Sequence, residues 1–119
     1  MLGRAPAGSL EHAVLTVLWD HGDWLTPAQV HERLDVERPV GYATVTTVLI
    51  RLFRKDRLTR QKVGHAYAYR PVQSREEYLA GRMDEILAAA TDRPAALAHF
   101  VDVLTDADRA EVRRYLGGQ

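Results

Sequence analysis

The sequence predicts a mainly α-helical fold with one small β-hairpin, arranged as an N-terminal lobe and a C-terminal helical lobe. Within residues 42–55 the apolar side chains recur at the spacing of one helix face: Val45, Val48, Leu49, Leu52 and Phe53. Residues 58–71 alternate in the manner of two short strands, and Gly64 and His65 form the reversal between them. Further amphipathic segments lie on both sides, so helices make up most of the fold.

The first helix is expected over residues 9–20, with Ser9 as its cap and Gly22 just after its end. Its predicted buried stripe consists of Leu10, Ala13, Val14, Val17 and Leu18. Trp24 and Leu25 then form a short extended piece.

A second helix is expected to start at Thr26. Thr26 and Gln29 have the spacing of a capping box, and Pro27 suits the first turn. Residues 35–41 form the turn that follows, because the residue before Pro39 is disfavoured in helical geometry. The third helix, residues 42–55, comes next.

The C-terminal part predicts three more helices. Ser74 and Glu77 form a second capping box, Pro94 begins the next helix, and Thr105 and Asp108 cap the last one. We therefore expect two lobes, residues 1–73 and 74–119. The second carries more apolar side chains than a small appendage can bury: Leu79, Met83, Ile86, Leu87, Leu97, Phe100, Val101, Leu104, Tyr115 and Leu116. A twofold homodimer through these residues is the expected solution.

Charge is unevenly distributed, although the net charge of the 119 residues is zero. Residues 51–70 contain seven basic residues and one acidic residue, a local net charge of +6. From residue 74 onward, nine acidic residues outnumber six basic ones. A concentrated positive stripe attracts a polyanion whatever the overall sum.

Composition argues against several classes of protein. The chain has no cysteine, hence no disulfide or thiolate metal site, and a cytoplasmic protein is expected. No apolar run approaches the roughly 18 residues of a membrane span, and the N-terminus lacks the apolar core of a signal peptide. No phosphate loop, cysteine nucleophile or paired-carboxylate spacing indicates an enzyme. No cofactor and no metal are expected, since no two histidines stand at i, i+4.

The predicted elements follow the order of a winged helix-turn-helix domain: helix, short strand, helix, turn, helix and hairpin. In such domains the third helix enters the major groove of DNA. A threonine on this helix can bond a base edge through its hydroxyl or contact thymine through its methyl group. Arginines on later turns of the same helix can contact phosphates. The predicted contacts to double-stranded DNA are Tyr42, Ala43, Thr44, Thr46, Thr47, Ile50, Arg51, Arg54, Arg60, Lys62, His65 and Tyr67. Two alternatives stay open: an ordinary helix face with a solvated hairpin, and a winged-helix protein-interaction module without sequence-specific DNA binding.

The chain resembles the BlaI/MecI penicillinase-repressor family of bacterial winged-helix regulators. The stretches "LEHAVLTVLWDHGDWLTPAQVHERL", "YATVTTVLIRLFRKDRLTR" and "GHAYAYRPV" are similar to its first two helices, recognition helix and wing. The resemblance implies a homodimeric repressor whose N-terminal lobe binds a pseudo-palindromic operator and whose C-terminal helices dimerise. In some members it implies control of β-lactamase genes by a membrane sensor protease.

Two departures from the family pattern limit what the resemblance implies. Ala43 and Thr46 stand where better-known members often have lysine and arginine, so their operator sequence does not carry over. Some members are cleaved at an Asn-Phe bond, and the matching pair here is His99 and Phe100. Phe100 is therefore either part of a cleavage site or a core residue. The cysteine pairs of the copper-responsive branch are absent.

Overall fold

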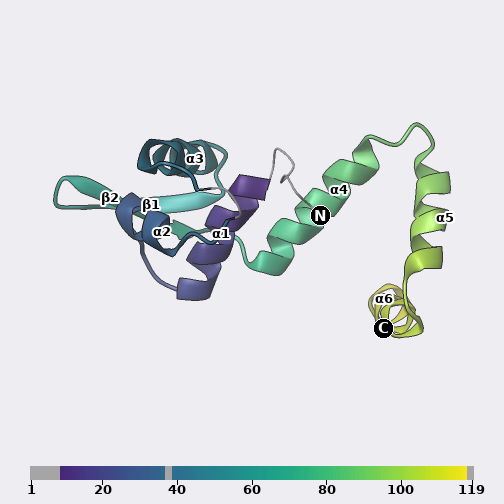
Figure 1. The fold of residues 1–119 in the computed structure, drawn as a ribbon. Helices are drawn as coiled ribbons and strands as arrows, with labels where there is room; N and C mark the ends of the chain where they lie inside the picture. Colours follow the sequence, from purple (N-terminus) through teal and green to yellow (C-terminus); the bar gives the residue numbers. More distant parts are fainter. Residues whose placement is uncertain (1–8, 37–38, 118–119) are drawn as a thin grey trace. The chain divides into compact units, whose positions relative to one another are not determined.

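The computed structural model describes residues 9–36 and 39–117. These residues form six α-helices and one antiparallel hairpin, as Figure 1 shows: α1 (Ser9–His21), α2 (Pro27–Arg33), α3 (Tyr42–Arg54), β1 (Leu58–Val63), β2 (Ala66–Pro71), α4 (Arg75–Ala88), α5 (Arg93–Val103) and α6 (Asp106–Gly117). The chain divides into two compact units, Met1–Tyr78 and Leu79–Gln119. The expected order of elements is confirmed.

Local hydrogen bonds at the helix starts explain why the helices begin where they do. Thr26 and Gln29 form the predicted capping box, with Thr26 N donating to Gln29 Oε1 over 2.9 Å and Gln29 N to Thr26 Oγ1 over 3.3 Å. Ser74 and Glu77 repeat it at 2.8 and 3.0 Å. These boxes satisfy backbone N–H groups that a helix end would leave unpaired. The predicted turn between α2 and α3 includes residues 37–38, and the predicted cap depends on the side chain of Ser9, the first residue of α1. Residues 37–38 and the Ser9 side chain lie outside what the structure describes.

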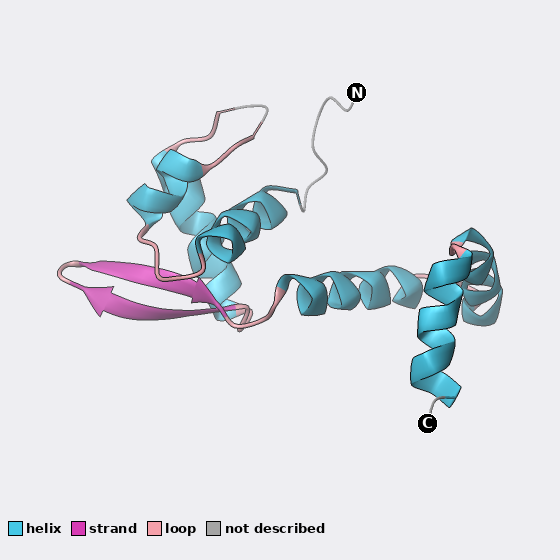
Figure 2. Cartoon of the chain, turned by 90° about the horizontal axis from the view of Figure 1, so that it is seen from below, coloured by secondary structure: helices cyan, strands magenta, loops and turns pink. Residues whose placement is uncertain are grey.

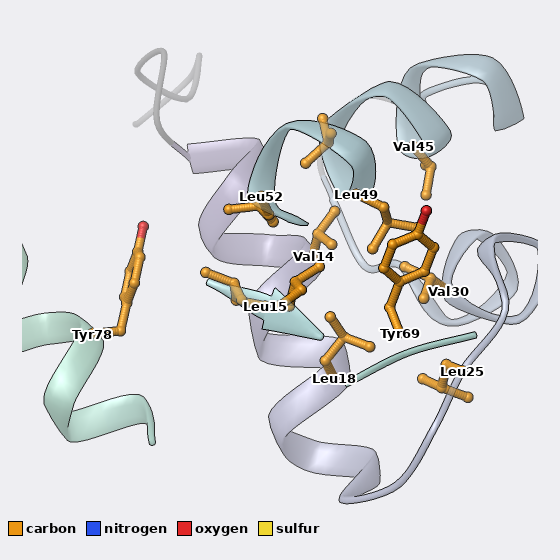
Figure 3. Packing of buried hydrophobic residues seen from close by; sticks show 12 residues of the cluster. Val14, Leu15, Leu18, Leu25, Val30, Val45, Leu49, Leu52, Tyr69 and Tyr78 are labelled. Carbon is orange, nitrogen blue, oxygen red and sulfur yellow. The ribbon is translucent and has the colours of Figure 1, made fainter. Parts of the chain in front are cut away.

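The core of the N-terminal unit joins α1, α2, α3 and the hairpin. Its buried side chains are Val14, Leu15, Leu18, Leu25, Val30, Val45, Val48, Leu49, Leu52, Leu58, Tyr69 and Tyr78. Figure 3 shows Val30, Leu49 and Tyr69, from α2, α3 and β2, gathered in this cluster. Leu15 is buried although the predicted stripe of α1 omitted it, whereas Leu10 and Val17 are only half-buried.

The hairpin is fixed to the core at its base. Leu58 pairs with Pro71 and Val63 with Ala66, so the reversal falls at Gly64 and His65, as predicted. Leu25 adds one bridge to the outer edge of β2, with Leu25 N donating to Tyr69 O over 3.1 Å and Tyr69 N to Leu25 O over 2.7 Å. Seen from two sides, the reversal extends beyond the helices α1–α3 (Figures 1 and 2).

The first turn of α4 packs into the N-terminal unit. Tyr78 is only 3% exposed, and its ring centroid lies 5.4 Å from that of Trp19 in α1. The indole Nε1 of Trp19 donates to Gln73 O over 3.0 Å, and Arg75 Nη2 lies 2.6 Å from Asp20 Oδ1. The packed unit therefore continues past residue 73; the proposed functional boundary at that residue stays a prediction.

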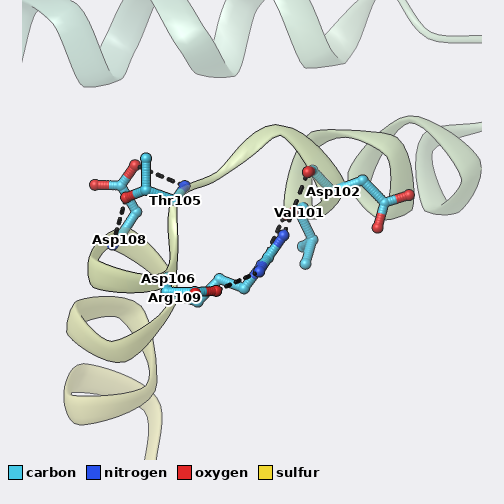
Figure 4. Close-up of polar contacts among 6 residues, drawn as sticks. All are labelled: Val101, Asp102, Thr105, Asp106, Asp108 and Arg109. Atoms are coloured by element: carbon cyan, nitrogen blue, oxygen red, sulfur yellow. Dashed lines mark hydrogen bonds and ion pairs between the residues drawn. The ribbon is translucent and has the colours of Figure 1, made fainter.

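In the C-terminal unit, polar contacts link α5 to α6 (Figure 4). Arg109 Nε donates to Val101 O over 3.1 Å and Nη2 to Asp102 O over 3.3 Å. Val101 O also accepts from Leu104 N over 3.2 Å, so Arg109 adds a second donor there and supplies one to Asp102 O near the end of α5. Thr105 and Asp108 cap α6 as predicted, with Asp108 N donating to Thr105 Oγ1 over 3.0 Å. Helix α5 begins at Arg93, one residue before the predicted Pro94, and Asp92 caps it.

Candidate nucleic-acid interface

The outward face of α3 is open to solvent from its first turn to its last. Tyr42 is 52% exposed, and the other exposed predicted contacts of α3 are Ala43, Thr44, Thr47, Arg51 and Arg54. Thr46 and Ile50 are half-buried. The opposite face supplies Val45, Val48, Leu49 and Leu52 to the core. The pattern that makes this segment a helix thus also decides which side chains another molecule can contact.

The hydroxyl protons of Thr46 and Thr47 already form hydrogen bonds within α3. Thr46 Oγ1 donates to Tyr42 O over 3.1 Å, and Thr47 Oγ1 donates to Ala43 O over 3.0 Å. A hydroxyl has one proton and two acceptor lone pairs. Each threonine can therefore still accept a hydrogen bond or offer its methyl group, and these are the modes that suit an amino group on a base or a thymine methyl.

A shallow hollow of about 450 Å³ follows on the same face, lined by Thr47, Ile50, Arg51, Arg54 and Lys55. Its lining combines a hydroxyl, an apolar side chain and three cations. Lys55 Nζ lies 3.0 Å from Glu11 Oε2, so Lys55 forms a salt bridge with α1. A surface of this chemistry suits the edge of a base beside its phosphates.

Helix α2 supports the start of α3 through His31. The ring nitrogen Nε2 of His31 forms a hydrogen bond of 2.8 Å with Val40 O, and because a carbonyl oxygen only accepts, Nε2 is the donor. The His31 ring also meets the Tyr42 ring edge-on, with centroids 6.4 Å apart. The turn before α3 is therefore tied to α2, as expected for a helix-turn-helix.

The wing carries its predicted residues on the outer part of the hairpin. Lys62, His65 and Tyr67 are exposed, and Lys62 faces Tyr67 across the two strands. Arg60 differs because it is half-buried. Its Cζ lies 4.0 Å from the ring centroid of Phe53 and 3.9 Å from that of Tyr67. The structure therefore brings the end of α3 and the wing together at Arg60.

Two exposed basic residues of the positive stripe were not among the predicted contacts. Lys55 lines the hollow on α3. Arg70 is exposed on β2, with its Cζ 4.4 Å from the ring centroid of Trp24. The basic stripe in the sequence contains both, but the helical spacing that selected Arg51 and Arg54 gave no reason to choose them.

The predicted dimerisation residues lie in the C-terminal unit, and most are exposed in the single chain. Exposed fractions reach 70% for Ile86, 72% for Tyr115 and 80% for Leu116, whereas Leu87 and Leu104 are half-buried. An apolar hollow of about 450 Å³ lies between α4 and α5, lined by Met83, Ile86, Leu87, Ala90, Ala96, His99, Phe100 and Val103. Val103, which is 75% exposed, was not predicted.

The candidate cleavage pair His99 and Phe100 lies inside α5. Both residues are exposed, and Phe100 retains 37% of its accessible surface. In the single chain Phe100 therefore lines an open hollow instead of filling a closed core.

Residues 9–36 and 39–117 contain neither a candidate metal cluster nor a candidate membrane span. No group of three or more histidine, aspartate or glutamate side chains in that part of the chain is placed to hold a metal ion. None of its helices is long and apolar enough to cross a membrane.

Comparisons with known proteins agree with this architecture. Residues 7–117 match the model of the penicillinase repressor family. Over 110 residues the chain is 43% identical to proteins named Transcriptional regulator BlaI from two strains of Mycobacterium tuberculosis, covering 90% of this chain and 79% of each relative. A MarR family protein from Bacillus stearothermophilus has a similar fold, with a TM-score of 0.50 and 18% identity over 94% of this chain and 71% of that chain.

The family match covers nearly all of the described chain, and the structural likeness confirms the winged-helix fold class expected from the sequence. The family consists of transcriptional regulators, so the expectation that the protein is not an enzyme is also confirmed. The chain belongs to the penicillinase repressor family of transcriptional regulators.

Proposed function

We propose that the chain is a homodimeric repressor that works on the nucleoid in the cytoplasm and binds a pseudo-palindromic operator in double-stranded DNA. Helix α3 enters the major groove, and the hairpin of β1 and β2 contacts the flanking backbone. One observation carries the proposal: the open face of α3 presents threonines and an isoleucine followed by arginines, next to a basic wing. The major groove admits a helix and presents a different pattern for each base pair.

The side chains of α3 divide into two roles. Thr47 and Ile50 line the hollow and can contact base edges or thymine methyl groups. Arg51 and Arg54 lie on later turns, where phosphate contacts would fix the position of the helix on the duplex. On the wing, Lys62 supplies an exposed charge.

Exposed apolar side chains of the C-terminal unit support the dimer. Ile86, Tyr115 and Leu116 are each at least 70% exposed, and the apolar hollow between α4 and α5 is open as well. So much exposed apolar surface is uncommon on a soluble monomer. Twofold pairing presents two copies of α3, which then contact half-sites about 10 base pairs apart or a multiple of that distance.

Salt-dependent titration tests the DNA-binding proposal. The full chain is titrated with a duplex that it has itself recovered from a random-sequence library, and with an unrelated duplex, at several salt concentrations. Neutralised phosphates give a linear fall of log affinity with log salt, with a slope of about −0.9 per phosphate. A protein-interaction module would bind neither duplex selectively, and that outcome would remove the repressor model.

Release of the repressor by a membrane sensor protease rests on the family resemblance alone, and α5 sets a physical condition for it. A protease needs its substrate in an extended form, but the bond between His99 and Phe100 lies within a helix. Cleavage there therefore requires local opening of α5. We expect the bond to be cut more slowly when dimerisation holds α5 closed.

A further inference from the structure

Arg60 lies where the wing leaves the core. Leu58 and Tyr69, at the base of the hairpin, are each only 2% exposed. Residues 61–67, on its outer part, are all exposed. Arg60 pairs with Tyr69 across the strands and is half-buried. It is therefore the outermost residue of β1 that still packs against the rest of the unit.

The guanidinium group of Arg60 joins three elements. Its Cζ lies 4.0 Å from the ring centroid of Phe53 in α3 and 3.9 Å from that of Tyr67 in β2. Its Nη1 donates to the hydroxyl of the buried Tyr69 over 3.5 Å. A planar guanidinium stacks on aromatic faces in a way that a lysine ammonium does not reproduce. The contact thus depends on arginine and not merely on a positive charge.

We propose that Arg60 is a positioning residue, which holds the wing against α3 and so sets where Lys62 and His65 meet the DNA. The inference rests on the proposed DNA-binding function and adds to it a role for Arg60 that does not need a phosphate. Four residues of extended strand, from Arg60 to the reversal, span about 13 Å. A rotation of about 20° at Arg60 therefore moves the wing tip by about 4–5 Å. A wing that swings freely has to be ordered when DNA binds.

Three variants of the full chain separate this role from a direct phosphate contact: Arg60→Lys, Arg60→Met and the matched control Lys62→Met. Lys62 lies on the same strand, and the control removes the same charge farther out. If Arg60 positions the wing, Arg60→Lys and Arg60→Met both lower affinity for the recovered duplex by about tenfold. If Arg60 neutralises a phosphate, Arg60→Lys keeps most of the affinity, because lysine also carries the charge.

Coupling between the two positions gives a second measurement. Once the wing is released, Lys62 no longer meets its phosphate in a fixed place. Adding Lys62→Met to Arg60→Met should therefore cost less affinity than Lys62→Met costs alone. Equal costs in the two backgrounds would mean that Arg60 and Lys62 act independently, which contradicts a positioning role.

The positioning role of Arg60 can also be tested without DNA, by backbone ¹⁵N relaxation of the free full-length protein. In wild type the amides of residues 61–67 should have order parameters near those of the helices, about 0.85. They should fall toward about 0.6 in both Arg60 variants and stay unchanged in Lys62→Met. Order parameters that do not change, or an Arg60→Lys variant that binds DNA like wild type, would overturn the proposal. A wild-type chain that binds no duplex overturns the proposed function instead, and the order parameters still decide whether Arg60 holds the wing.

Discussion

Thr47→Ala tests whether α3 reads bases. Thr47 is exposed, and its hydroxyl donates to Ala43 O within the same helix. Alanine is a better helix former than threonine by roughly 0.5 kcal/mol, so the fold should lose little or no stability. Any change in binding then reports the contact itself. A single non-bidentate base contact is worth about 1 kcal/mol of discrimination, the lower end of the usual range.

The dimer doubles this effect, because both half-sites lose the contact. Two well-separated losses add to about 2 kcal/mol, and this free energy corresponds to roughly a 30-fold loss of operator affinity relative to random DNA. The assay is competitive titration of the recovered duplex against an unrelated duplex at fixed salt. Equal weakening of both duplexes by Thr47→Ala would show that Thr47 does not read bases.

Arg54→Ala is the matched control, since Arg54 is two turns farther along the same exposed face. It should weaken both duplexes alike and flatten the salt slope by about one unit per subunit. Two further substitutions identify the contacting group of Thr47. Thr47→Val keeps the methyl group and loses the hydroxyl, whereas Thr47→Ser does the reverse. Because the hydroxyl proton is already donated to Ala43 O, we expect no partner that needs a donor from Thr47.

Three other outcomes are expected. Leu49→Ala removes a side chain that is 0% exposed, so the free energy of unfolding, measured in urea, should fall by about 2–5 kcal/mol; a smaller loss would mean that the core can collapse onto the site. Lys62→Ala should weaken operator and random DNA alike while the melting temperature stays the same, since exposed charges contribute little to stability; a large drop in that temperature would give Lys62 a structural role. A fragment ending at Ala80 should sediment as a monomer and bind the operator about 100-fold more weakly than the full chain; a full chain that is itself monomeric at micromolar concentration would contradict the dimer.

Helix starts were predictable because their signals are local. The capping boxes at Thr26 and Ser74 depend on a partner three residues away, so neither needs information about the rest of the fold. The open face of α3 was predictable for a related reason. Once Val45, Val48 and Leu52 face the core, helical geometry assigns the remaining side chains to the outside.

Contacts between elements were not predictable in the same way. Arg60 was expected to be one of several solvent-facing charges of the wing, because no local pattern records that Phe53 and Tyr67 lie on either side of its guanidinium group. In α1 the run from Ala13 to Leu18 is almost wholly apolar, so its periodicity allowed more than one buried stripe, and Leu15 was missed.

Helix α5 shows a further limit of periodicity. Apolar side chains lie around most of its circumference, and none of its residues is buried in the single chain. A helix with no polar face does not indicate which side meets a neighbour. The predicted stripe therefore included Phe100 and Val101 but omitted Val103, which is 75% exposed.

The packing of α4 decides how the two units can be separated experimentally. The capping box of Ser74 marks the start of a helix, but it does not mark the end of the N-terminal unit. Tyr78 packs against Trp19 within that unit, and the Cζ of Arg57 lies 5.2 Å from the Tyr78 ring centroid.

A fragment ending at residue 73 would uncover the Trp19 ring and remove a buried tyrosine, and burial of such a ring is worth several kcal/mol. Weak DNA binding by that shorter fragment would then reflect damaged packing as much as a lost partner. A fragment ending at Ala80 keeps Tyr78 and removes most of the exposed apolar side chains, so its affinity reports the contribution of the second half-site.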